Sequence, residues 1–177
     1  MGEKLKGVLE LVVVLVAAVV IAFLFRAFVA EVYIVPSGSM LETIQEGDRL
    51  VGEKVSFHFR EPEAGEVVTF DDPIQPGTTL IKRVIATEGQ TVDLRDGVLY
   101  IDGLAQDEDY TLGKPSEPLQ TPYGITYPYT VPDGCIWVMG DNRTNSKDSR
   151  YFGAVPVSNV TSRATFIFWP FADARGL

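Results

Sequence analysis

Histidine, cysteine and positive charge are scarce in this 177-residue chain. The only histidine is His58 and the only cysteine is Cys135, so an internal disulfide and a cysteine-histidine zinc site are both excluded. Lysine and arginine total 15 against 24 aspartate and glutamate residues, which gives a net charge of −9. This acidity argues against a nucleic-acid partner, because phosphate binding requires a basic surface. We therefore expect no metal, no cofactor and no nucleic acid.

Long apolar runs are also rare, and the one that is present spans residues 8–30. It is broken by Glu10 near one end and Arg26 near the other. As a helix it is about 34 Å long, enough to cross a hydrocarbon core of roughly 30 Å if both charged side chains reach the interfaces. A cleavable secretory signal is the alternative, but the small residues that a cleavage site needs do not occur together near Ala30. We therefore predict a single-pass transmembrane helix.

The charges on either side of this run predict its orientation. Lys4 and Lys6 precede it and only Arg26 lies at its far end, and the cytoplasmic flank of a membrane helix carries the excess of basic residues. Residues 1–7 are thus predicted to form a short cytoplasmic tail, and the chain beyond residue 30 is predicted to be exported.

Beyond residue 40 the sequence has no long segment with the 3.6-residue period of a helix. Short β-branched and apolar runs alternate with Gly, Pro, Asp and Asn, which predicts a mainly β, antiparallel fold. The turn at 95–97 (RDG) predicts a hairpin. We assign 31–90 and 134–171 to a β core and 91–133 to a small inserted β/loop subdomain that is mostly loop from residue 102. The expected strands are 31–35, 50–59, 66–70, 80–86, 91–94, 98–101, 135–139 and 164–169.

Two hydroxyl residues occupy a turn just past the apolar run, in residues 36–40 (PSGSM). A serine nucleophile needs a positioned base, and His58, among aromatic and charged neighbours, is typical of a half-exposed strand. The remaining candidate is Lys82, in the apolar segment 79–86, because burial disfavours the ammonium form and lowers a lysine pKa. A strand lysine whose head reaches solvent is the alternative.

The polar segment 140–150 (GDNRTNSKDSR) has the composition of a turn-rich surface loop. It lacks the ligand spacing, turn glycine and terminal glutamate of a calcium loop. A functional interpretation is that charge-assisted pairs hold this loop against the Lys82 strand and bring Ser146 beside the ammonium group. The charged residues in this prediction are Arg83, Asp141, Asp148 and Arg150.

Three segments, 36–40, 81–84 (IKRV) and 140–150, resemble in order the signature boxes of the type I signal peptidases. The resemblance extends from about Lys4 to Phe171. It implies that Ser39 is the nucleophile and Lys82 the general base, that the Ser37 hydroxyl and the Ser39 N–H form the oxyanion hole, and that Ser146 orients Lys82. It also implies a serine endopeptidase that cleaves signal peptides from exported proteins after a small-x-small motif, with its catalytic domain on the outer face of the bacterial plasma membrane.

The resemblance further implies a shallow apolar substrate site, with the substrate added as an extended strand. The predicted substrate-binding residues are Val32, Ile34, Val35, Met40, Ile44, Leu80 and Ile81. Expected partners are the signal peptides of secreted preproteins, the lipid bilayer and, functionally, the export translocon. Aromatic residues suit contact with a bilayer surface, although for each one a place in the core is the alternative. These candidates are Tyr33, Phe57, Phe59, Trp169 and Phe171.

The chain departs from the family pattern at Glu42, where a proline is usual, and at the turn 87–90 (TEGQ). Neither change involves Ser39 or Lys82, but both fall where the rim of a substrate pocket is expected. Two alternatives stay open. One is a Ser-Lys peptidase of narrower specificity, and the other is a noncatalytic, membrane-tethered β binding module.

Overall fold

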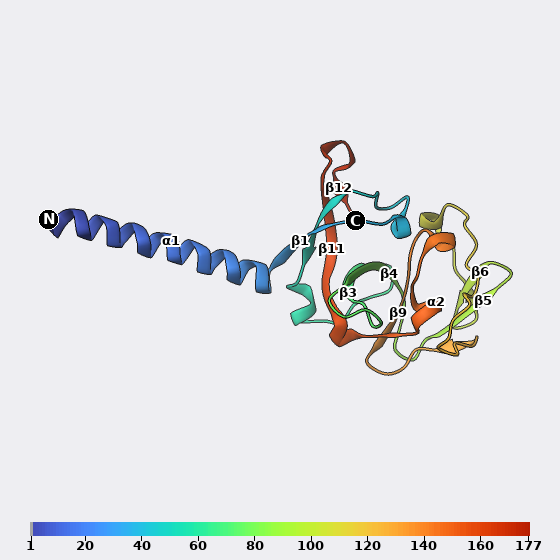
Figure 1. The fold of residues 1–177 in the computed structure, drawn as a ribbon. Helices are drawn as coiled ribbons and strands as arrows, with labels where there is room; N and C mark the ends of the chain where they lie inside the picture. The colour runs from blue at the N-terminus through green and yellow to red at the C-terminus, as the bar shows by residue number, and fades with distance from the viewer. Residues whose placement is uncertain (1) are drawn as a thin grey trace.

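A computed structural model describes residues 2–177, and Met1 of the predicted tail and the side chains of Glu3 and Lys4 lie outside the described part. The chain begins with one long helix, α1 (Gly2–Phe28), which projects away from a β-rich body (Figure 1). Its segment Leu5–Phe28 is long and apolar enough to cross a membrane and has no face buried against the body. The predicted apolar helix is confirmed, although it ends at Phe28 because Ala30 already begins the first strand.

The body is built on a large antiparallel sheet in the order β1-β2-β11-β3-β4-β9-β10, with β12 paired to β11. The mainly β fold predicted from the sequence is confirmed. The strands are β1 (Ala30–Ile34), β2 (Arg49–Glu53), β3 (Val67–Asp71), β4 (Thr79–Thr87), β9 (Cys135–Met139), β10 (Val155–Pro156), β11 (Val160–Trp169) and β12 (Arg175–Gly176).

A second, smaller antiparallel sheet has the order β7-β6-β5-β8. Asp96 and Gly97 both have positive φ, 52° and 79°, and they form the expected two-residue turn between β5 and β6. From β7 to β8 the structure has one short 3₁₀ helix, η3 (Asp109–Thr111), in agreement with the loop-rich composition. The strands are β5 (Thr91–Arg95), β6 (Val98–Ile101), β7 (Leu104–Ala105) and β8 (Tyr129–Thr130).

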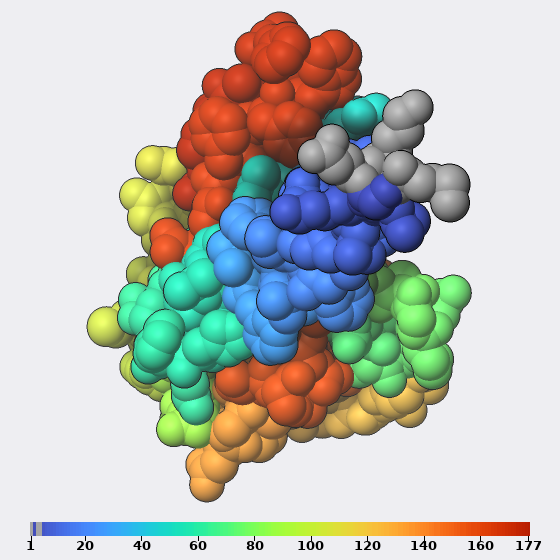
Figure 2. Space-filling view, turned by 90° about the vertical axis from the view of Figure 1, so that its left-hand side faces the viewer, coloured from blue at the N-terminus to red at the C-terminus, as the bar shows by residue number. Residues whose placement is uncertain are grey.

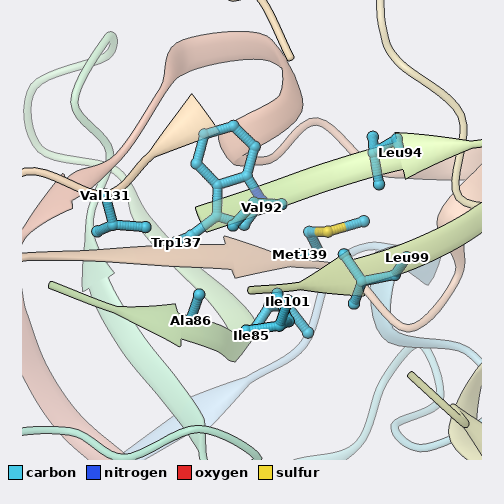
Figure 3. Close-up of a cluster of buried hydrophobic side chains, with 9 residues drawn as sticks. All are labelled: Ile85, Ala86, Val92, Leu94, Leu99, Ile101, Val131, Trp137 and Met139. Carbon is cyan, nitrogen blue, oxygen red and sulfur yellow. The ribbon is translucent and has the colours of Figure 1, made fainter. Parts of the chain in front are cut away.

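One of the hydrophobic clusters joins the two sheets (Figure 3). Val92 and Leu99 of the small sheet pack with Ile85 of β4 and with Trp137 and Met139 of β9. The segment 91–133 is therefore packed directly on the strands that flank the candidate site, and its assignment as a separate subdomain stays a prediction.

The predicted strand 50–59 is wrong in its second half. Strand β2 ends at Glu53, whose carboxylate accepts the N–H of Ser56 at 3.0 Å, and the chain turns into a 3₁₀ helix, η2 (Ser56–His58). His58 is thus exposed on a turn, with Nε2 3.4 Å from the carbonyl oxygen of Phe28 at the end of α1. The Glu53 carboxylate takes a backbone N–H that a continued strand would use for pairing, so the strand ends. The apolar pattern of residues 50–59 does not show that this hydrogen bond forms.

Short helices complete the fold and carry several candidate residues. The nucleophile candidate lies on η1, and the polar segment 140–150 contains η4 and the start of α2. Their bounds are η1 (Gly38–Met40), η4 (Arg143–Asn145), α2 (Ser149–Phe152), η5 (Val157–Asn159) and η6 (Phe171–Asp173).

Candidate active site

Ser39 and Lys82 meet at the centre of the candidate site. Lys82 Nζ donates a hydrogen bond of 2.7 Å to Ser39 Oγ and another of 2.8 Å to the carbonyl oxygen of Ile81. Ser39 lies on η1, where the fully buried neighbour Met40 fixes the turn in the core. Lys82 lies on β4, opposite Val68 of β3, and only 3% of it is exposed. Its head therefore does not reach solvent.

Burial lowers the pKa of Lys82 to about 8, against the opposing charges of Asp148, Asp141 and Asp72, which raise it. The ammonium form loses its hydration in this apolar strand, and none of these carboxylates restores it fully. A substantial fraction of Lys82 is thus neutral near pH 8, and a neutral amine can accept a proton from the hydroxyl that it contacts.

Ser37 and Ser146, the other two predicted site serines, differ in burial and in contacts. Ser37 precedes η1 in an extended conformation, is exposed, and its hydroxyl makes no cap hydrogen bond. Ser146 Oγ is buried and has no hydrogen-bond partner among the described residues. It packs against Gly140, where an added Cβ would overlap both Ser146 Oγ and the Ser39 carbonyl oxygen. Ser146 is therefore adjacent to the Ser39 backbone, without a direct bond to Lys82.

The four charged residues predicted to hold the polar loop form two separate ion pairs. Asp141 accepts hydrogen bonds from Arg83 at 2.9 and 2.6 Å, and Asp148 accepts from Arg150 at 2.9 and 3.0 Å. Both carboxylates are fully buried. The first pair joins the loop to β4, and the second also receives the N–H of Gly140 at 3.0 Å.

Four further residues contact this site or its loop and were not predicted from the sequence: Asn142, Arg143, Thr43 and Glu108. Asn142 Nδ2 donates to the carbonyl oxygen of Gly38 at 2.7 Å, and its N–H donates to that of Ser39 at 3.1 Å. Thr43 Oγ1 donates to Asp141 at 2.5 Å. The membership of Asn142 and Arg143 in the segment 140–150 was the available signal for them, whereas Glu108 lies in a loop-rich segment that offers no pattern.

A small cleft of about 40 Å³ lies between the end of β1 and the start of β4. These strands are not neighbours in the sheet, so the sheet curls to bring them together. The residues that line the cleft are Tyr33, Ile34, Val35, Pro36, Thr69, Thr79, Leu80 and Ile81.

Four of the predicted substrate residues line this cleft, and three do not. Ile34, Val35, Leu80 and Ile81 form part of its walls. Val32 is exposed on β1 outside the cleft. The other two, Met40 and Ile44, are completely buried. They belong to the same core cluster as Val35, which lines the cleft.

The chain resembles known proteins over most of its length. The family described as "Signal peptidase, peptidase S26" matches residues 8–169. Probable signal peptidase I-1 of Synechocystis sp. is 44% identical over 168 residues, which cover 91% of this chain and 82% of that protein. Signal peptidase I of Bacillus licheniformis is 35% identical over 177 residues, covering 98% and 95%. Thylakoidal processing peptidase 1 of Arabidopsis thaliana is 37% identical over 163 residues, covering 86% and 46%.

A crystal structure of a signal peptidase I from Enterococcus faecalis V583 matches this fold with a TM-score of 0.50 and 33% identity. The match covers 59% of this chain and 97% of that chain. The family match, the relatives and the fold agree with one another. The chain therefore belongs to the signal peptidase family, peptidase S26, whose signal peptidase I members are membrane-associated serine endopeptidases that cleave signal peptides.

Proposed function

We propose that this protein cleaves signal peptides with Ser39 as nucleophile and Lys82 as general base. The observation that carries the proposal is the 2.7 Å hydrogen bond between Lys82 Nζ and Ser39 Oγ, in a setting where Lys82 is 3% exposed. A buried amine in direct contact with a serine hydroxyl is the arrangement that the Ser-Lys variant of serine proteolysis requires.

In the proposed reaction, neutral Lys82 takes the proton from Ser39 Oγ as the oxygen attacks the scissile carbonyl carbon. The tetrahedral oxyanion accepts hydrogen bonds from the Ser39 N–H and the Ser37 hydroxyl. When the peptide bond breaks, the Lys82 ammonium returns its proton to the departing amine, and the signal peptide remains as an ester on Ser39. Lys82 then activates a water molecule that hydrolyses the ester and restores both side chains.

The cleft supports a preference for small residues in the substrate. At about 40 Å³ it has room for a methyl group but not for a leucine or phenylalanine side chain. Among the described residues, β1 pairs with β2 alone, and it carries Ile34 in the wall of the cleft and exposed Val32 outside it. An extended substrate strand that binds here would turn alternate side chains toward the cleft side, so that one small side chain of a small-x-small motif enters the cleft and the other lies beside it.

We further propose that α1 anchors the protein with its catalytic body on the outer face of the plasma membrane, where preproteins leave the translocon. Figure 2, with α1 pointing toward the viewer, shows the β11 end (red) and the η2 region (teal) around the helix. These regions carry Phe59, Trp169 and Phe171, which are 85%, 44% and 78% exposed and suit a bilayer surface. Tyr33 and Phe57 are half-buried and pack in the core instead.

Cleavage of a preprotein by the purified full chain, beside the Ser39→Ala variant, tests this function. We expect processed product with the wild type and none with the variant, and stoichiometric modification of Ser39 by a serine-reactive probe. A noncatalytic binding module predicts neither cleavage nor modification. Activity on one precursor, with none on others that carry the same motif, would favour the narrower Ser-Lys peptidase.

A further inference from the structure

Glu108, in the inserted segment, forms a buried ion pair with Arg143 of the polar loop. Its two carboxylate oxygens accept hydrogen bonds from the Arg143 guanidinium at 2.6 and 2.7 Å. The Arg143 side chain is 0% exposed and that of Glu108 is 9% exposed. Two residues of the same segment add to this pair. The Tyr110 hydroxyl donates a hydrogen bond of 2.7 Å to Glu108, and the Ser116 hydroxyl accepts one from Arg143. A guanidinium buried this deeply depends on its counter-ion.

Arg143 transmits this contact to the backbone around the nucleophile. Its Nε donates to the carbonyl oxygen of Gly140 at 3.1 Å, and Gly140 has no room for a side chain because it packs on the Ser39 carbonyl and Ser146. The preceding residue, Asn142, binds the carbonyl oxygens of Gly38 and Ser39. Figure 1 shows η3 (olive) beside η4 (orange), where the two segments meet.

Three arginines around the site each have one buried carboxylate partner. Arg83 has Asp141 and Arg150 has Asp148, and both carboxylates belong to the polar loop itself. Arg143 takes its partner from a segment 35 residues earlier in the chain. The carboxylate of Glu108 therefore connects the inserted segment to the polar loop 140–150, and through that loop to the turn that carries Ser39.

We propose that Glu108 is a positioning residue for proteolysis, which acts through Arg143 to fix residues 140–146 against the backbone of Ser39. The inference rests on the proposed Ser39-Lys82 function. The Ser39 N–H is a proposed oxyanion donor, and a small displacement of such a donor slows the chemical step more than it weakens substrate binding.

The test compares Glu108→Gln with wild type in the full chain in detergent, on a peptide with an Ala-x-Ala site. Glutamine keeps the size of the side chain and removes its charge. We expect kcat to fall by about 10-fold to 100-fold with KM changed by less than about twofold. The rate of Ser39 modification by the serine-reactive probe should fall in parallel. The pH at which activity rises should not move, since Glu108 is not among the groups that shift the pKa of Lys82.

Asp107→Asn and Asp109→Asn are matched controls, because each removes one negative charge from an exposed neighbour of Glu108. Both should keep the wild-type kcat. A double variant, Glu108→Gln with Arg143→Gln, should be no slower than Arg143→Gln alone, because both act through one contact. If Glu108→Gln does not fold, Tyr110→Phe, which removes one hydrogen bond to Glu108, should lower kcat about twofold to fivefold.

A folded Glu108→Gln protein with the wild-type kcat, or a loss of kcat equal to that of Asp107→Asn, would overturn this inference and leave the proposed function intact. Cleavage that survives Ser39→Ala would contradict the proposed function itself.

Discussion

Asn142 is bound to Gly38 through a side-chain hydrogen bond of 2.7 Å from Nδ2 to the carbonyl oxygen. Residues 104 positions apart in the chain are thereby joined one residue before the candidate nucleophile. Both partners are buried, so water cannot replace the lost donor when the asparagine is removed.

Asn142→Ala should therefore loosen the nucleophile turn. We expect a loss of about 1–3 kcal/mol in the free energy of unfolding, because the buried Gly38 carbonyl loses its shorter hydrogen bond and keeps only the 3.3 Å bond from the N–H of Leu41. We also expect kcat to fall about tenfold. Thermal melts and steady-state peptide cleavage measure the two effects. Asn145→Ala, at an exposed position of the same loop, is the control, and an equal effect at both positions would contradict the assigned role of Asn142.

The pH dependence of cleavage should report on the pKa of Lys82. Activity should rise with pH along a limb near pH 8, since Lys82 must be neutral to accept the Ser39 proton. Asp72 raises this pKa, so Asp72→Asn should move the limb to lower pH. Asparagine can still accept the loop N–H groups of Ile74 and Gln75 that Asp72 binds. The measurement is kcat/KM against pH.

Asp71→Asn is the matched control for this shift, because Asp71 is exposed and is not among the groups that act on Lys82. If the rise of kcat/KM with pH does not shift in Asp72→Asn, or shifts equally in Asp71→Asn, the titrating group is not Lys82.

The size of the cleft between β1 and β4 should determine which substrates are cleaved. Leu80 forms one wall, so Leu80→Ala should admit a larger residue at the last position of the signal peptide. We expect kcat/KM for a valine substrate to rise about tenfold relative to the alanine substrate. Competition between the two peptides in one reaction gives the ratio directly. As a control, Leu104→Ala, at an exposed position of β7, should leave this ratio unchanged. An unchanged ratio in Leu80→Ala would show that the cleft does not bind the last residue of the signal peptide.

The exposed aromatic residues around α1 should contact lipid in the full-length protein. The chain has two tryptophans, of which Trp169 is 44% exposed and Trp137 is completely buried. In vesicles that contain brominated lipid, the fluorescence of a Trp137→Phe protein, which reports Trp169, should be strongly quenched. A Trp169→Phe protein, which reports Trp137, should show little quenching. Equal, weak quenching in both would place the β11 end away from the bilayer.

Much of the fold and of the site could be predicted because it follows from local patterns. The apolar run gave α1, the β-branched run around Lys82 gave β4, and the Asp96-Gly97 pair gave the hairpin turn. The strand predicted over residues 50–59 was wrong in its second half, because the carboxylate of Glu53 accepts the N–H of Ser56 and the chain turns there. Hydrophobic periodicity carries no information on such a contact.

Long-range polar partners could not be predicted in the same way. The ion pairs of Asp141 and Asp148 join residues within recognisable segments, so their approach could be inferred. Glu108 lies among other acidic residues in a loop-rich segment, and only the three-dimensional structure selects it as the partner of Arg143. The burial of Met40 and Ile44 behind the cleft likewise depends on how the sheet curls, which strand patterns do not specify.

Lys82 is central to the account because its neutral amine is assigned the proton of Ser39. Its pKa of about 8, below the 10.5 of an ordinary lysine, means that the unfolded chain binds this proton more tightly than the folded protein. The folded state is therefore penalised below about pH 8, by about 1.4 kcal/mol for each unit of pKa depression, and the penalty fades as the pH rises toward 10.5.

The most direct test is the Lys82→Met variant, measured at pH 7 for preprotein cleavage and for the free energy of unfolding beside the wild type. Methionine has a similar length and no charge, so the account predicts no cleavage and a stability that is unchanged or raised. A variant that still processes preproteins would contradict the assignment of Lys82 as the base. A large loss of stability would indicate a structural, ion-paired lysine instead, because removal of one partner leaves a buried charge uncompensated.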